Sequence, residues 1–246
     1  MLISKAMQES HNIFLPGGFK QFKTLKGKFS FSSRAVLIIG SGTEKIAEKM
    51  IKSGSSKVKI IVNDVDSLLT SKLQLHSDLP IETKLMDFDN TDFADKEFDL
   101  IYAQGSISST NRNKIIKEIK RVLKPEGTFC VGEITSLEKV YPKFIKEIFE
   151  SSDLLPLFHE ECEKYYNNRM FDVLFTQDLS SSLKSFYENA AVELKKNIDK
   201  LSGQEKSYYK KLLNKISHES NAFLNLGADK YIGFKMLILK LSASAS

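Results

Sequence analysis

Cysteine and histidine are both scarce in this chain, and their scarcity limits the chemistry that it can carry. The 246 residues include two cysteines, Cys130 and Cys162, and four histidines. Two cysteines provide neither a disulfide framework nor the paired spacing of a zinc site, so we expect reduced, structural thiols and no metal. A lone histidine is more often a surface or core residue than a catalytic base, so no catalytic residue is assigned from the sequence.

Long apolar runs are absent as well. Residues 1–18 contain no stretch long enough for a signal peptide, and no segment reaches the roughly 20 apolar residues of a membrane span. We therefore expect a cytoplasmic protein with no membrane span. A chain of 246 residues can bury a full core as one α/β domain with an elaboration.

The net charge of +5 is concentrated in two segments. Residues 1–31 carry five lysines against one glutamate, and residues 184–218 carry eight lysines against four acids. An anionic substrate, a nucleic acid or an acidic partner would explain these segments. A solvated, lysine-rich surface explains them more simply, and the segments lack the regular aromatic residues of a single-strand binding platform. Nucleic acid is therefore not the expected partner.

A third glycine is missing from the pattern that binds dinucleotides. Val36–Ile39 is typical of a strand buried on both faces, and it ends in Gly40-Ser41-Gly42. Glycines let the backbone turn sharply and approach a ligand closely. The dinucleotide fingerprint needs Gly or Ala three residues after the second glycine, where this chain has Lys45. A nicotinamide-dependent oxidoreductase is therefore disfavoured.

Three more apolar segments follow, with helical patterns between them, which predicts a parallel sheet. They are residues 59–64, ending in Asp64; residues 85–89, with Asp87 and Phe88; and residues 98–105, ending in Gln104 and Gly105. A carboxylate after the second strand can accept hydrogen bonds from both hydroxyls of a ribose. The pattern therefore favours a nucleoside-type ligand.

From about Val36 to Ile134 these motifs resemble class I S-adenosylmethionine (SAM) dependent methyltransferases, of the small-molecule type. The spacing from Asp87 to Asp99 is similar to the family's segment that leads to the Phe-Asp opening strand four. Residues 121–128 resemble the family's turn into strand five. The resemblance implies an α/β, Rossmann-like, doubly wound sheet of seven strands, mixed in direction and ordered 3-2-1-4-5-7-6.

The C-terminal half predicts helices over residues 137–150 and 156–166, a sixth strand over 171–176 and a seventh over 231–239. The resemblance implies that the last two strands pair as an antiparallel hairpin. Residues 179–228 separate them, and apolar positions at helical spacing predict two amphipathic helices there, joined by a turn at residues 202–204. This helical hairpin is either a lid over the acceptor site or a packing appendage or homodimer surface.

The expected organisation is a cap segment over residues 1–31, followed by a SAM-binding methyltransferase domain over 32–246 that contains the 179–228 insertion. Pro16-Gly17-Gly18 breaks any helix ahead of the first strand. This turn resembles a segment that helps to cover the site in several small-molecule methyltransferases. Its alternative role is a plain loop whose neighbouring phenylalanines pack on the domain.

Two positions depart from the family pattern. Ile38 stands where the family has an acid that reaches the methionine part of the cofactor. Glu44 replaces the third glycine of the methyltransferase family's own glycine motif. Glu44 either takes over part of the missing acid's role, since its charge suits a helix N-terminus and a cationic ligand, or is a solvated residue of the first helical turn.

Missing motifs exclude two substrate classes. Residues 103–107 read Ala-Gln-Gly-Ser-Ile, which is not the Asn/Asp-Pro-Pro-aromatic motif of amino-group methylases of bases. Neither Cys130 nor Cys162 lies on a loop after a proline, where a cytosine carbon methylase has its nucleophile. The expected acceptor, a small molecule, is what the resemblance to the small-molecule type implies.

The resemblance implies a cofactor site for SAM and its product S-adenosylhomocysteine (SAH). The glycine-turn residues would hold the methionine and ribose end of the cofactor, and the acid after strand two would bind the ribose hydroxyls. The loop after strand three would contact the adenine, and the end of strand four would line the mouth of the site beside the sulfonium. The residues assigned to these parts are Gly40, Ser41 and Gly42; Asp64 and Val65; Asp87 and Phe88; and Gln104 and Gly105. The alternatives are an inactive, methyltransferase-like scaffold protein and an RNA or protein methyltransferase.

Overall fold

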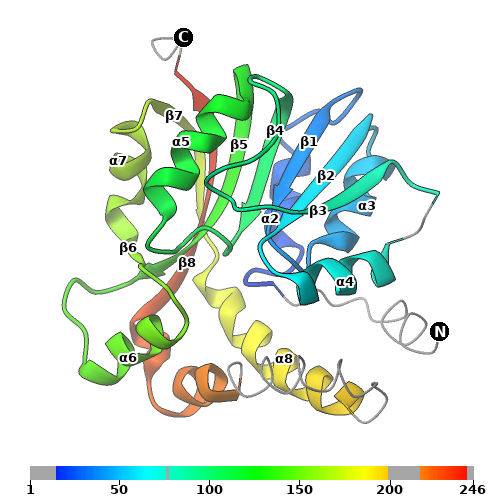
Figure 1. Cartoon of the computed structure of the whole chain (residues 1–246). Coiled ribbons are helices and arrows are strands. Elements are labelled where there is room, and N and C mark those ends of the chain that lie inside the picture. The colour runs from blue at the N-terminus through cyan, green and yellow to red at the C-terminus, as the bar shows by residue number, and fades with distance from the viewer. Residues whose placement is uncertain (1–14, 76–77, 199–216, 243–246) are drawn as a thin grey trace.

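The computed structural model describes residues 15–75, 78–198 and 217–242. Parallel strands and helices alternate through the first half of the chain (Figure 1). The elements of this half are α2 (Lys20–Lys26), β1 (Ala35–Ile39), α3 (Glu44–Lys52), β2 (Lys57–Val62), α4 (Val65–Gln74), β3 (Ile81–Leu85), β4 (Phe98–Gln104) and α5 (Arg112–Val122).

The second half completes the sheet and adds helices at one end of it. Its elements are β5 (Leu123–Ser136), α6 (Lys143–Ser151), β6 (Leu157–Phe158), the 3₁₀ turn η1 (His159–Glu161), α7 (Cys162–Asn167), β7 (Phe171–Asp178), η2 (Ser180–Ser182), α8 (Leu183–Ile198), η3 (Ala228–Lys230) and β8 (Ile232–Leu241). Residues 217–225 are also helical. No helix in the described ranges combines the length and the apolar character needed to cross a bilayer.

The main sheet has the order β3-β2-β1-β4-β5-β8-β7. β1 to β5 are parallel, whereas β8 runs antiparallel to both β5 and β7. When β7 and β8 are counted as strands six and seven, this is the predicted order, so the fold prediction is confirmed. The two-residue strand β6, which pairs with the end of β5, is an addition that the sequence did not predict.

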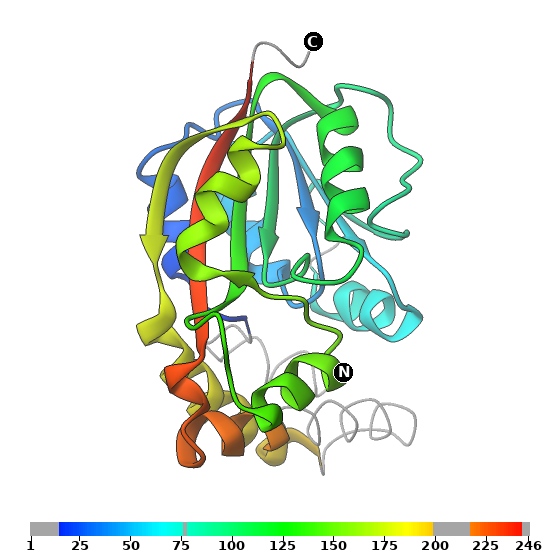
Figure 2. The same ribbon diagram turned by 90° about the vertical axis from the view of Figure 1, so that its left-hand side faces the viewer.

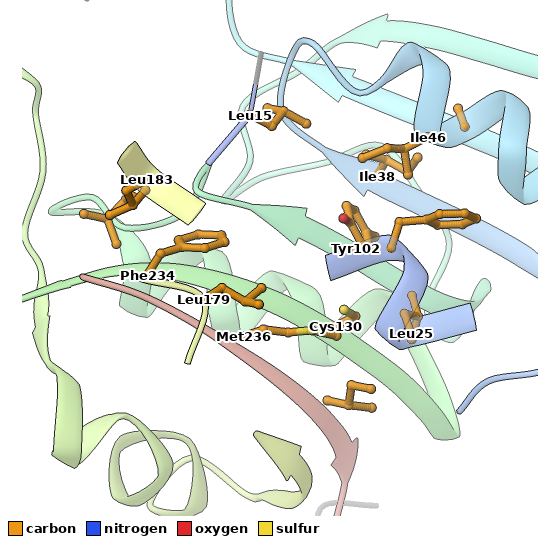
Figure 3. Close-up of a cluster of buried hydrophobic side chains, with 14 of the residues drawn as sticks. Leu15, Leu25, Ile38, Ile46, Tyr102, Cys130, Leu179, Leu183, Phe234 and Met236 are labelled. Carbon is orange, nitrogen blue, oxygen red and sulfur yellow. The ribbon is translucent and has the colours of Figure 1, made fainter. Parts of the chain in front are cut away.

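Side chains of the central strand alternate between two hydrophobic cores. Val36 and Ile38 pack in the core beneath α2 and α3, whereas Leu37 and Ile39 pack in the core beneath α5 and α7. Figure 3 shows the first core, where Leu25 of α2 and Ile46 of α3 meet the sheet. All five residues of β1 are buried, because helices cover both faces of the sheet at this strand.

Both helices predicted directly after strand five begin later than expected. The predicted helix 137–150 begins at Lys143, because β5 continues to Ser136 in pairing with β8 and Pro142 starts the helix. The predicted helix 156–166 begins at Cys162, because Leu157 and Phe158 pair with β5 instead. Leu157 and Phe158 were therefore wrongly predicted as helix, and residues 159–161 form the 3₁₀ turn η1 that leads into α7.

The insertion between β7 and β8 is helical where it is described. α8 forms its first arm, and residues 217–225 belong to its second. The predicted turn at 202–204 lies outside the described residues. Figures 1 and 2 both show α6, α8 and residues 217–225 (orange) at the same end of the sheet.

Candidate functional site

A cavity of about 480 Å³ lies where the parallel strands end. Ligands of open α/β sheets bind at the carboxyl ends of the strands, so this is the expected place for a site. Its walls come from the glycine turn after β1, the loops after β2, β3 and β4, the end of α6, the helical insertion and the N-terminal segment. The cavity therefore gathers residues that are far apart in the sequence, from Leu15 to Glu219.

The glycine turn is fixed by close packing and by local hydrogen bonds. Gly40 has φ +113°, and a Cβ at this position would lie 2.6 Å from the Cβ of Ser106. The Ser106 hydroxyl donates to the carbonyl of Ile39 at 2.5 Å, and the Thr43 hydroxyl donates to the carbonyl of Gly40 at 3.0 Å. The turn brings bare backbone to the cavity wall and leaves no room for a side chain at Gly40.

Glu44, the residue in place of the third glycine, is buried. The solvent-exposed fraction of this residue is 3%, which is among the lowest of the polar residues. Burial raises the pKa of Glu44, and hydrogen bonds from Ser71 and from the backbone of Gly42 and Glu44 oppose this shift. The residue does not line the cavity. Of the two alternatives for Glu44, the solvated residue is therefore wrong, and Glu44 joins the glycine turn to α4.

Ile38 is also turned away from the cavity. It is fully buried in the core with Leu25 and Ile46, as Figure 3 shows. An apolar side chain here completes the packing of β1 against α3. The family's acid has no counterpart at this position.

The acids after β2 and β3 are placed differently with respect to the cavity. Asp64 caps α4, accepting a hydrogen bond from the Ser67 amide at 2.7 Å. Asp64 and the 57% exposed Val65 lie just outside the lining, whereas their neighbour Asn63 belongs to it. The loop after β3 contributes Asp87, Phe88 and Asp89 to the wall.

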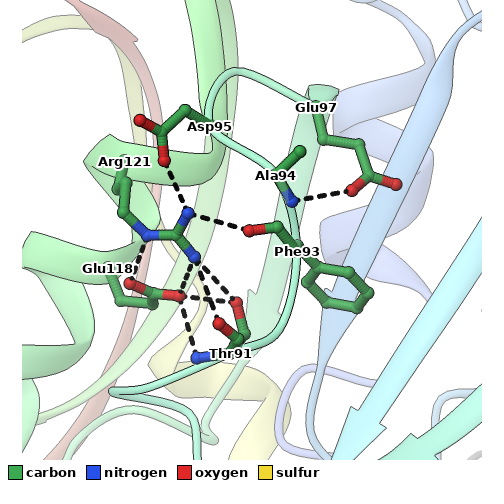
Figure 4. A network of polar contacts seen from close by, with 7 residues as sticks. All are labelled: Thr91, Phe93, Ala94, Asp95, Glu97, Glu118 and Arg121. Atoms are coloured by element: carbon green, nitrogen blue, oxygen red, sulfur yellow. Dashed lines mark hydrogen bonds and ion pairs between the residues drawn. The ribbon is translucent and has the colours of Figure 1, made fainter.

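A network around Arg121 holds the rest of that loop in place (Figure 4). The guanidinium pairs with Glu118 and with Asp95, both at 2.6 Å, and donates to the Phe93 carbonyl at 2.8 Å. Burial alone would raise the pKa of Glu118, but hydrogen bonds from Arg121 and Thr91 outweigh it and lower the pKa to about 2. The network therefore ties α5 to the loop that carries Asp87 and Phe88.

Gln104 ties the end of β4 to the N-terminal segment. Its amide nitrogen donates to the carbonyls of Pro16 at 2.6 Å and Gly18 at 2.9 Å, and its oxygen accepts from the Tyr102 hydroxyl. Gly105 lies under the Pro16 ring, which would be 3.2 Å from a Cβ at this position. The Pro16 ring therefore covers one part of the cavity.

A buried ion pair supports the opposite wall. Glu133 and the Arg112 Nε atom are 3.1 Å apart, with exposed side-chain fractions of 0% and 4%. The Tyr166 hydroxyl donates to one Glu133 oxygen, and the Ser108 hydroxyl donates to the other. Because Ser108 lines the cavity, this wall is fixed to the buried pair beneath it.

Six of the nine predicted site residues line the cavity, namely Gly40, Ser41, Asp87, Phe88, Gln104 and Gly105; Gly42, Asp64 and Val65 do not. The sequence analysis missed much of the opposite wall, including Ser108, Ser109, Asn111, Asp153, Tyr187 and Glu219. Only the helical spacing of Tyr187 drew notice, as a packing signal. Neither His159 nor His218 lines the cavity, and the other two histidines, His11 and His76, lie outside the described residues.

Comparison with known proteins gives a family match and a shared fold. Residues 37–131 match the family model of a methyltransferase domain. The chain is 31% identical over 104 residues to the sterol 24-C-methyltransferase ERG6 of Saccharomyces cerevisiae. That match covers 39% of this chain and spans 27% of the length of the yeast protein.

Solved structures share the fold at low sequence identity. A Haemonchus contortus phosphoethanolamine N-methyltransferase 2 in complex with SAM is 15% identical, with a TM-score of 0.73, over 98% of this chain and 56% of the other. A SAM-dependent methyltransferase from Thiobacillus denitrificans in complex with SAH is 14% identical, with a TM-score of 0.68, over 96% of each chain. Residues 37–131 therefore match a methyltransferase-domain family model, and the sheet has the fold seen in these solved structures.

Proposed function

We propose that this chain is a SAM-dependent methyltransferase that acts on a small-molecule acceptor. One observation carries the proposal: the glycine turn and the Asp87-Phe88 loop line a single cavity at the carboxyl ends of the strands. Its volume of about 480 Å³ lies within the roughly 300–1,000 Å³ that is usual for small-molecule sites.

The residues present fit a cationic nucleoside cofactor. Gly40 brings its backbone to the wall where no Cβ fits, and the loop after β3 adds the Asp87 carboxylate and the Phe88 ring to the same cavity. SAM, when bound, supplies a methyl group activated by a positively charged sulfur. In this assignment Gly40 and Ser41 receive the amino-acid and ribose end, Asp64 accepts the ribose hydroxyls, and Asp87 and Phe88 contact the adenine.

The protein's own contribution to methyl transfer is alignment and exclusion of water. Leu15 and Pro16 cover one side of the cavity, and Phe186 and Tyr187 of the insertion line another. These contacts support the assignment of residues 1–31 as a cap and of residues 179–228 as a lid on the 32–246 domain. Orientation of two bound reactants lowers the barrier without a dedicated acid or base.

The direct test is calorimetric titration with SAM and with SAH. Asp64→Asn keeps an oxygen to cap α4 but loses the charge, and we expect about tenfold or weaker binding because a hydrogen bond to a charged group is lost. Asp66→Asn removes the same charge from the next exposed acid of α4 and is the matched control. We expect it to change the affinity for either ligand by no more than about twofold. A folded wild-type protein that binds neither ligand would refute the proposal and favour the scaffold alternative.

Two finer assignments accompany this function. We propose that the protein acts in the cytoplasm, since Cys130 and Cys162 are both free, buried thiols. A homodimer formed through the helical insertion stays a prediction, which sedimentation of the purified protein would test.

A further inference from the structure

The described lining of the cavity is acidic although the chain is basic overall. It includes four carboxylates, those of Asp87, Asp89, Asp153 and Glu219, and no lysine, arginine or histidine of the described residues. The chain as a whole has a net charge of +5. A cavity with charge of one sign attracts ligands of the opposite sign.

The four carboxylates lie on two different walls. Asp87 and Asp89 belong to the loop after β3, where the proposed function places the adenine. Asp153 is the second residue after the end of α6, and Glu219 lies in the second arm of the insertion. The Ser152 hydroxyl donates to the Glu219 carboxylate, which joins these two segments. The second acidic wall is therefore built from elements outside the cofactor-binding strands.

Tyr187 of α8 adds an independent polar group to this second wall. The residue is only 6% exposed, yet its hydroxyl makes no hydrogen bond to another described residue. Because Tyr187 lines the cavity, a ligand bound there can hydrogen-bond to this hydroxyl. Burial raises the pKa of Tyr187, and the nearby Glu219 charge raises it further, so the hydroxyl stays protonated.

Aromatic rings hold Tyr187 in place. Its ring centroid lies 5.0 Å from that of Phe186 and 4.8 Å from that of Phe223. Phe186 also lines the cavity. Aromatic faces together with carboxylates bind cations well, because the ring quadrupole and the charges act in the same direction.

We propose that this wall is the acceptor subsite and that it selects a molecule with a positively charged nitrogen, which Glu219 and Asp153 attract and the Tyr187 side chain contacts. The inference rests on the proposed methyltransferase function and names its substrate class. A protonated amine can donate to the Tyr187 oxygen and to a carboxylate. An anionic acceptor would meet two like charges here, which disfavours phosphorylated and carboxylated molecules at this wall.

Binding of matched probes tests the charge preference. The pairs are choline against 3,3-dimethylbutan-1-ol, in which carbon replaces the nitrogen, and butylamine against butan-1-ol. Each is titrated calorimetrically at neutral pH with and without saturating SAH. We expect the cation to bind about tenfold more tightly than its neutral partner in at least one pair. Equal or unmeasurable affinities within both pairs would overturn the inference.

Four variants, one of them a control, test which residues cause the charge preference. Glu219→Gln should reduce the cation-to-neutral ratio at least about fivefold, and Tyr187→Phe should weaken butylamine while affecting choline less, since choline has no N–H to donate. Glu188→Gln removes the same charge from an exposed position of α8 and should leave the ratio unchanged. A ratio that survives in a Glu219→Gln, Asp153→Asn double variant would refute the subsite.

Titration with SAH itself distinguishes a failure of this inference from a failure of the proposed function. If SAH binds and cations show no preference, only the acceptor class is wrong. If SAH does not bind, the methyltransferase assignment fails, and the titrations without SAH still report whether the wall selects cations.

Discussion

Gln104 and Pro16 lie 88 residues apart in the chain, and the Gln104 amide nitrogen donates to the Pro16 carbonyl at 2.6 Å. The same nitrogen donates to the carbonyl of Gly18, and the Tyr102 hydroxyl donates to the Gln104 oxygen. The amide nitrogen therefore holds the N-terminal segment against the end of β4, and the bond from Tyr102 fixes the orientation of the amide.

Gln104→Met should destabilise the protein by roughly 2–3 kcal/mol, because it leaves the Tyr102 hydroxyl and two carbonyls without their partner. Urea unfolding measures the change, and SAH titration should show weaker binding in the same variant. Gln177→Met, at an exposed glutamine on β7, is the control and should cost less than about 1 kcal/mol. Equal losses in the two variants would contradict this role of Gln104.

Glu118 should make stability depend on acid pH. Its pKa in the folded protein is about 2, against an ordinary value of 4.5. The unfolded chain therefore takes up the proton first, so the stabilisation is complete above about pH 5 and is lost as the pH falls toward 2. Glu118→Gln should lower the free energy of unfolding by on the order of 2 kcal/mol at pH 6 and by little near pH 2.

Unfolding in urea at several pH values checks the Glu118 prediction. The quantity of interest is the difference between wild type and variant, since other carboxylates titrate in the same range. Glu138→Gln, at an exposed acid between β5 and α6, removes the same charge outside the Arg121 network and is the control. A constant difference between pH 2 and pH 6 would rule out the linkage.

Glu44 should make stability depend on pH in the opposite sense to Glu118. Its pKa is raised by burial, so the folded protein keeps this proton at pH values where the unfolded chain has lost it. Folding stability from this group is therefore greatest at low pH and declines as the pH rises above the ordinary value of 4.5. Glu44→Gln should match wild type near pH 4 and exceed it by on the order of 1 kcal/mol at pH 7. A variant less stable than wild type at pH 7 would show that the charge itself is needed.

Gly132 should tolerate no side chain. A Cβ there would overlap the Gln21 amide oxygen and the Phe234 ring, which meet above β5. We expect Gly132→Ala to cost roughly 2–3 kcal/mol in thermal or urea unfolding, as in other overpacked cores. Gly27→Ala is the control: φ is −72° and the nearest atom to a Cβ is 3.5 Å away, so the change should be close to neutral.

Strong, regular patterns explain why so much of the fold was predictable. The buried run at Val36–Ile39 and the order of the later apolar segments gave β1, β2, β4, β5, β7 and β8. The failures arose where tertiary pairing overrides local preference. Leu157 and Phe158 fit a helix by spacing, but the end of β5 offers them strand hydrogen bonds.

The cofactor half of the cavity followed from motifs, and the other half did not. Gly40 and Asp87 have fixed places in a known pattern, so their meeting in one cavity could be anticipated. Asp153 and Glu219 come together only through the packing of α6 against the insertion, which no local pattern encodes. Glu44 was uncertain for the same reason, because its burial depends on where α4 lies.

The cavity is lined by residues as far apart in sequence as Leu15 and Glu219. Residues 37–131, which match the domain family, include the glycine turn but neither of these two. An expression fragment cut to those limits would lose β7, β8, the N-terminal roof and the insertion wall together. A fragment that keeps the whole cavity lining and the complete sheet therefore extends at least from Leu15 to Leu241, the end of β8, and shorter fragments would report on an incomplete cavity.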